Sequence, residues 1–228
     1  MAKRKNQTTC GTSAEVGQAQ RLGIFGASGC GKTTKARELI RNLNRVIFFE
    51  PLADDLRRLV EKDGFKAVAG LPELFRKVRA DFSKGFKLAY YPAAGDEVRE
   101  LSQLSDFLMN IQSGYGFRHS AQITLVVDEL DLGFPTGESL KNPRNGFKNL
   151  CCRGRHTGIH VVGLSQRMHL VDNVFRANCS GVYLYRHSEP ADIDVGLKII
   201  GREYREKFRA LDNFQYIYKA GQKIILKT

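Results

Sequence analysis

One stretch decides the fold of this chain, and it reads Gly26-Ala27-Ser28-Gly29-Cys30-Gly31-Lys32-Thr33. It has the spacing of a phosphate-binding loop, in which glycines let successive backbone N–H groups turn inward and approach an anion closely. Such a loop lies between a strand and a helix, because the helix presents its positive N-terminal end to the same anion. The short, mostly apolar run 22–25 predicts the strand, and we expect the helix over 33–42.

The loop predicts a nucleoside triphosphate and its metal ion as ligands. Lys32 is placed to act as a point charge on the β- and γ-phosphates, and the Thr33 hydroxyl is placed to bind Mg²⁺. We therefore expect ATP and Mg²⁺ as cofactors. The expected nucleotide-binding residues are Gly26, Ala27, Ser28, Gly29, Cys30, Gly31, Lys32, Thr33 and Thr34.

A second apolar run, Ile123–Val127, leads into two adjacent carboxylates. In parallel α/β sheets the carboxyl ends of the strands form the edge where ligands bind. We expect Asp128 to hold Mg²⁺ through a water molecule, and Glu129 to polarise the attacking water as general base. Asp131 is an alternative metal contact. Adjacent Asp and Glu residues favour hydrolysis over phosphoryl transfer to a small molecule.

A third segment, 151–167, contains an arginine-rich turn that runs into an apolar strand over 160–164. The strand is followed by Gln166, whose amide is able to contact the γ-phosphate or the attacking water and so sense whether it is present. A polar residue that merely caps the strand is the alternative interpretation.

Together the three motifs resemble those of the FtsK/HerA superfamily of DNA-pumping ATPases, over roughly residues 21–186. The small size resembles the viral branch, the genome-packaging ATPases of tailless, membrane-containing double-stranded DNA viruses. The resemblance implies a P-loop NTPase fold of the ASCE/RecA-like type, with the strand before Gln166 between the two motif strands. It gives Lys32, Thr33, Asp128, Glu129 and Gln166 the roles described above.

The same resemblance implies partners and a location. It predicts double-stranded DNA and a homo-oligomeric ring, usually a hexamer, with capsid or packaging-vertex proteins as possible further partners. The expected location is the host cytoplasm or a packaging vertex of the virion. A ring ATPase needs a cation delivered by the neighbouring subunit. We expect Arg153 and Arg155 to supply it, with Arg186 as a further candidate.

The rest of the chain predicts one α/β domain over 21–228, with a mostly parallel sheet covered by helices on both faces. Residues 1–20 read as a flexible basic arm. The expected strands are 22–25, 46–49, Phe86–Tyr91, Ile123–Val127, 160–164 and 182–185, with a C-terminal hairpin at 215–219 and 223–226. Besides 33–42, the expected helices are 54–62, 72–82 and Glu97–Ile111.

Composition points to a polyanionic partner. The net charge is +12 and the sequence pI about 9.6, and residues 1–20 carry three cationic side chains against Glu15, so the body keeps +10. This excess suits nucleic acid. Five cysteines fit a reducing compartment better than a disulfide scaffold. No apolar run approaches the roughly 20 residues that span a bilayer, so we expect no transmembrane segment.

A loop over 133–147 directly follows the carboxylates and suggests a pore or lid, with Lys141, Arg144 and Lys148 available for DNA phosphate; an ordinary surface loop is the alternative. Three other functions stay open. The first is a phage assembly or export ATPase with a cargo other than DNA. The second is a monomeric small-molecule kinase with the same glycine loop, and the third is a non-catalytic nucleotide-binding module.

Overall fold

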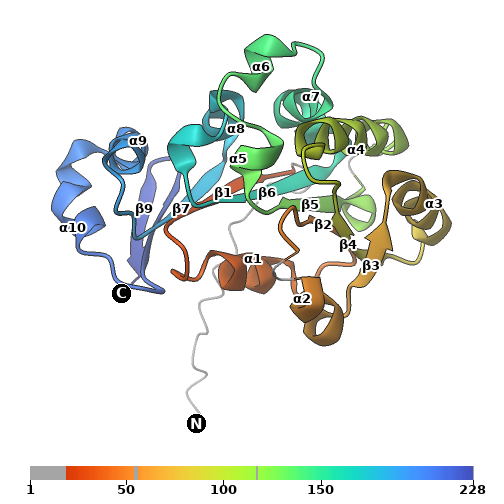
Figure 1. Cartoon of the computed structure of the whole chain (residues 1–228), viewed down its shortest axis with the longest axis horizontal. Helices are drawn as coiled ribbons and strands as arrows, with labels where there is room; N and C mark the ends of the chain where they lie inside the picture. Colours follow the sequence, from red (N-terminus) through yellow and green to blue (C-terminus); the bar gives the residue numbers. More distant parts are fainter. Residues whose placement is uncertain (1–18, 54–55, 117, 228) are drawn as a thin grey trace, which may run out of the picture.

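The computed structural model of the chain describes residues 19–53, 56–116 and 118–227. Most of the predicted N-terminal arm, residues 1–18, lies outside this range. Within it Figure 1 shows an α/β body. The strands are β1 (Arg21–Phe25), β2 (Arg45–Phe49), β3 (Lys66–Ala69), β4 (Phe86–Tyr91), β5 (Ile123–Val127), β6 (Ile159–Ser165), β7 (Gly181–Tyr185), β8 (Tyr216–Ala220) and β9 (Lys223–Lys227).

The helices alternate with the strands along most of the chain. They are α1 (Lys32–Ile40), α2 (Leu56–Asp63), α3 (Leu71–Asp81), α4 (Glu97–Ile111), α5 (Leu130–Gly133), α6 (Glu138–Lys141), α7 (Gly146–Arg153), α8 (Asn173–Asn178), α9 (Pro190–Ile200) and α10 (Arg205–Arg209). Short 3₁₀ turns occur at η1 (His119–Ala121), η2 (Gly154–Thr157), η3 (Met168–Leu170) and η4 (Arg202–Tyr204). None of the helices in the described ranges is both long and apolar enough to cross a membrane.

The strands form a single sheet in the order β3-β4-β2-β5-β6-β1-β7-β8-β9. In this order, every neighbouring pair from β3 through to β7 is parallel, whereas β8 pairs antiparallel with both β7 and β9. The mostly parallel sheet and the C-terminal hairpin are therefore as the sequence predicts. Strand β6 lies between β1 and β5, which confirms the expected place of the strand before Gln166.

Each face of the sheet is covered by helices. Along β2, Val46 and Phe48 join the core beneath α1 and α2, while Ile47 and Phe49 join the larger core on the other face. This alternation is the period of two that a strand imposes on its side chains. Figure 1 shows α1 and α2 below the sheet and α4, α5, α7 and α8 above it. Burial on both faces explains why β2 after Arg45 and β5 apart from Thr124 are apolar.

The register brings the three motifs to one edge. Phe25 at the end of β1 pairs with Ser165 of β6, and Val127 at the end of β5 pairs with Gly163. The phosphate-binding loop 26–33, the carboxylates after β5 and Gln166 after β6 consequently all follow strand ends at the same edge of the sheet.

Candidate functional site

The phosphate-binding loop 26–33 is fixed to the ends of two neighbouring strands. The N–H of Gly26 donates to the carbonyl of Ser165 at 3.3 Å, and the N–H of Ala27 donates to the carbonyl of Arg186 at 2.8 Å. Gly29 and Gly31 adopt left-handed φ angles of 72° and 106°, which side chains with a Cβ disfavour. The ends of β6 and β7, the two strands that flank β1, and the glycines together set the curvature of the loop.

Gly26 is glycine because no side chain fits there. A Cβ at this position would lie 2.5 Å from Cβ of Tyr185 and 2.7 Å from Sγ of Cys30. Cys30 itself is fully buried, and burial raises the pKa of its thiol. The thiol is therefore protonated at neutral pH and packs inside the loop as a small apolar group.

Lys32 begins α1 and folds back over the loop. Its Nζ donates to the carbonyl of Ala27 at 3.1 Å, and the residue is only 7% exposed. Thr33 is half-buried and Thr34 is exposed in the first turn, where α1 carries no acidic residue. The loop thus offers an anion a buried ammonium group and an uncompensated helix N-terminus.

The two carboxylates after β5 differ in backbone conformation. Asp128 is 8% exposed, and one of its oxygens, Oδ1, accepts the N–H of Glu129 at 2.9 Å. Glu129 has a left-handed φ of 41°, uncommon for a residue other than glycine. Strained backbone of this kind concentrates at functional sites. A hydroxyl from Thr33 and a carboxylate from Asp128 are hard oxygen donors of the kind Mg²⁺ takes beside substrate phosphates.

Gln166 contacts the predicted general base directly. Its Nε2 donates to Oε1 of Glu129 at 2.6 Å. The contact joins the residue after β6 to the second residue after β5, although 37 positions separate them in the chain. Sequence reasoning placed both residues at this edge, and the structure brings their side chains together.

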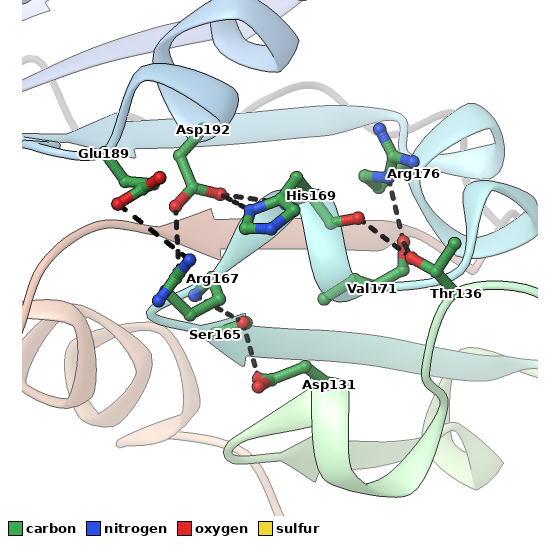
Figure 2. Close-up of polar contacts among 9 residues, drawn as sticks. All are labelled: Asp131, Thr136, Ser165, Arg167, His169, Val171, Arg176, Glu189 and Asp192. Atoms are coloured by element: carbon green, nitrogen blue, oxygen red, sulfur yellow. Dashed lines mark hydrogen bonds and ion pairs between the residues drawn. The ribbon is translucent and has the colours of Figure 1, made fainter.

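The residues on either side of Gln166 are held by a polar network (Figure 2). Ser165 Oγ donates to Oδ1 of Asp131 at 2.6 Å and accepts the N–H of Arg167 at 2.9 Å. The Arg167 guanidinium pairs with Asp192 of α9, with Nε 3.4 Å from Oδ2. Asp192 is 1% exposed and also accepts the N–H of His169 at 2.8 Å. Asp131, the alternative metal contact, has a structural partner here.

Sequence reasoning missed this network. Ser165 closes the apolar strand β6, so a hydrogen-bonding role had no local signal. Asp192 lies in α9, which was not among the expected helices, and its contact with His169 spans 23 residues. Only the fold brings α9 to the segment that follows Gln166.

The segment after the carboxylates makes backbone hydrogen bonds to the segment after β6. The carbonyl of Phe134 accepts the N–H of Asp172 at 3.0 Å, and the N–H of Thr136 donates to the carbonyl of Leu170 at 2.7 Å. Figure 2 shows Thr136 close to His169 and Val171. The segments after β5 and β6 are thereby tied to each other.

Only part of the predicted loop 133–147 is a continuous exposed segment. Residues 140–144 are exposed, whereas Asn145 is fully buried and caps α7 through its side chain. Lys148 Nζ donates to the carbonyl of Ser139 at 3.0 Å. Figure 1 shows α6 standing out above the body. Lys141 and Arg144 are therefore the cations at this tip that point to solvent.

The two arginines expected to act on a neighbouring subunit lie at the other edge of the sheet, away from the phosphate-binding loop. Arg153 ends α7 and Arg155 lies in η2; both are exposed and both precede β6. The length of β6, about 20 Å at 3.3 Å per residue, separates them from Gln166. Neither is placed to act on the phosphate loop of its own subunit. Arg186 follows β7 at the sheet edge that carries the phosphate-binding loop, and its Nε donates to Oδ1 of Asn213 at 3.4 Å.

No protein-family model and no curated protein matches the chain. Several solved structures do. The DNA-packaging ATPase B204 of Sulfolobus turreted icosahedral virus superposes with a TM-score of 0.70 at 16% identity, over 93% of this chain and 98% of that one. The genome-packaging NTPase B204 of Sulfolobus turreted icosahedral virus 2, in complex with AMPPCP, gives 0.68 at 14% identity, over 92% and 97%.

VirB4 of Thermoanaerobacter pseudethanolicus is more distant, with a TM-score of 0.54 at 12% identity over 90% of this chain and 88% of that one. These neighbours match the resemblance that the three motifs carry. What the chain shares with them at such identities is the fold. The chain accordingly has the P-loop NTPase fold seen in the viral genome-packaging ATPases.

Proposed function

We propose that this chain is an ATP-hydrolysing motor that moves double-stranded DNA and packages a viral genome into a preformed capsid. The observation that carries the hydrolytic part is the 2.6 Å contact between Gln166 and Glu129 at the edge that holds the phosphate loop. A base, a sensing amide and an anion cradle then share one site, which is what hydrolysis of a bound triphosphate requires.

The residues divide the chemistry among them. Lys32 and the loop N–H groups hold the β- and γ-phosphates, and Thr33 and Asp128 hold the metal ion. Bound Mg²⁺ supplies neutralisation of charge on the phosphate oxygens. Glu129 takes the proton from the attacking water. The Gln166 amide orients that water, and its bond to Glu129 links the base to the segment held by Asp131 and Asp192.

This linkage offers a route from hydrolysis to movement. A γ-phosphate that attracts the Gln166 amide would weaken its bond to Glu129. Ser165 and Arg167 flank Gln166 and are held by Asp131 and by Asp192 of α9, so a change at Gln166 reaches two further elements. The tie between residues 134–136 and 169–172 extends the same connection toward α6 and its exposed tip.

DNA binding is supported by charge. The chain carries 36 Lys and Arg residues against 24 Asp and Glu. A motor that ignores sequence should grip phosphates rather than bases, and this grip should weaken with salt. We assign Lys141 and Arg144 to DNA contact, because they are exposed on the projecting tip at α6. In a hexameric ring these tips would line the channel, and Arg153 or Arg155 would reach the neighbour's ATP.

The test is the ATPase rate with and without long double-stranded DNA across a salt series. Wild type should be stimulated by DNA, and stimulation should fade as salt rises. The Lys141→Glu/Arg144→Glu variant should lose the stimulated increment. The control, Lys84→Glu/Lys223→Glu, makes the same charge change at exposed sites away from α6 and should keep it. Hydrolysis that ignores DNA in the wild type would favour an export ATPase with another cargo.

A further inference from the structure

An exposed aromatic side chain lies against the phosphate loop, and the nucleotide site as described does not use it. Phe214 belongs to the segment 211–215 between α10 and β8. Its N–H donates to the carbonyl of Cys30 at 3.0 Å, and a Cβ added to Gly31 would lie 2.9 Å from its Cδ1. The ring is therefore placed beside the last glycine of the loop.

Core packing does not explain this position. Phe214 is 65% exposed, and its backbone φ of 68° is left-handed, a conformation that bulky residues avoid. The nearby aromatic residues behave in the opposite way and pack together with at most 9% exposure; they are Tyr183, Tyr185, Tyr216 and Tyr218. Strained backbone clusters at active sites and ligand-binding sites, and we therefore interpret the exposed ring as a contact for a ligand.

The order of the strands fixes the direction in which a bound nucleotide runs. Glu129 and Gln166 follow β5 and β6, which lie on one side of β1. The γ-phosphate must face them, because they handle the attacking water. The ribose and base must then leave the loop on the opposite side of β1, where β7 and β8 lie. Phe214 immediately precedes that part of the sheet.

We propose that Phe214 is the platform on which the base of the bound nucleotide stacks. Aromatic rings stack on bases through their π faces, an interaction that tolerates any base. Phe214 would accordingly contribute affinity for the nucleoside and leave the choice of base to other contacts. The bond from Arg186 Nε to Asn213 Oδ1 holds the adjacent residue to the end of β7 and so steadies the platform.

The inference rests on the nucleotide site proposed above, so the experiment separates base from phosphates. Affinity is measured for ATP and for inorganic tripolyphosphate, which has no base. Phe214→Ala should weaken ATP binding by about tenfold, as expected for loss of one stacked base, and leave tripolyphosphate affinity within about twofold. Tyr91→Ala removes an exposed aromatic ring (43%) from β4, on the far side of the sheet, and should change neither affinity.

A second variant gives a direct readout. The chain contains no tryptophan, so Phe214→Trp introduces a single indole fluorophore. It should keep ATP affinity, and its fluorescence should be quenched by ATP but not by tripolyphosphate. Equal ATP affinity of Phe214→Ala and wild type, or an indole that ATP leaves unquenched, would overturn the platform while the phosphate site stands. Wild-type protein that binds neither ATP nor tripolyphosphate would overturn both proposals.

Discussion

Glu129 shows at the scale of one residue how the chain combines strain with chemistry. Its φ of 41° directs the chain from β5 into α5, and its carboxylate accepts the Gln166 amide. The left-handed conformation costs a residue with a Cβ on the order of 1–2 kcal/mol of free energy. Its persistence at a non-glycine position is understandable if the carboxylate itself is needed.

Replacing Glu129 with Gln should separate binding from turnover. The amide keeps the size of the side chain but cannot take a proton from water. We expect ATP affinity to stay near that of the wild type and kcat to fall by roughly 100-fold to 10,000-fold, the usual contribution of a general base. Equilibrium binding and steady-state hydrolysis measure the two effects. Normal turnover in this variant would remove Glu129 from the role of base.

The Gly26→Ala variant tests whether the close packing around Gly26 shapes the phosphate-binding loop. In Gly26→Ala the added methyl meets Tyr185 and Cys30 below 3 Å, so the loop must shift. Overpacking of this kind destabilises by about 1–3 kcal/mol, and we expect ATP affinity to fall by roughly tenfold or more if binding must reverse the shift. Gly64→Ala is the control, because its Cβ meets open space away from the loop.

Gly64 has a φ of 72°, so its alanine variant is destabilised by the backbone alone. It should lose some thermal stability and bind ATP as the wild type does. Similar ATP affinities for both variants would show that the close packing around Gly26 does not shape the phosphate site. Thermal unfolding and ATP titration on the same samples give the comparison.

At the scale of elements, buried polar groups join α9 to the sheet edge that carries the phosphate-binding loop. His187, between β7 and α9, is 7% exposed and packs against the ring of Phe208. Burial lowers the pKa of His187 to about 4, although the nearby Asp192 carboxylate acts in the opposite direction. The imidazole is therefore neutral at physiological pH, and protonation requires a charge to be buried.

This predicts an acid-sensitive step in stability. The ordinary pKa of His is about 6.5, so between pH 6.5 and pH 4 the unfolded chain takes up a proton that the folded chain does not. The contribution of His187 is complete above about pH 6.5 and is lost as pH falls to about 4, on the order of 3 kcal/mol. The variant His187→Asn should show a flatter pH profile of the unfolding free energy. Parallel profiles would contradict the assignment.

Elements with a regular pattern could be predicted, and those with a broken pattern could not. Helix α4 and strands β4 and β5 have the expected boundaries. The apolar residues of α4 recur at helical spacing, and those of β4 and β5 make up most of each strand. Helix α9 turns Asp192 and Gly196 to the interior, which interrupts its apolar side. Strand β3 lies at the sheet edge with one buried residue, Val68, and so lacks alternation.

At the scale of the whole molecule, the edge that gathers the site was predictable, and the opposite edge was not. The phosphate loop, Asp128, Glu129 and Gln166 each follow a strand, and parallel strands bring their carboxyl ends together. Arg153 and Arg155 are near Gln166 in the chain, yet they lie beyond the other end of β6. Proximity in sequence does not distinguish the two ends of a strand, and a role toward a neighbouring subunit depends on assembly.

The central claim of the proposed function is movement along double-stranded DNA, and the most direct test is movement itself. A third strand annealed to double-stranded DNA is displaced by any protein that travels along the duplex. We predict displacement with ATP by the wild type, none with Glu129→Gln, and decline with rising salt. ATP hydrolysis stimulated by the same DNA without displacement of the third strand would contradict translocation.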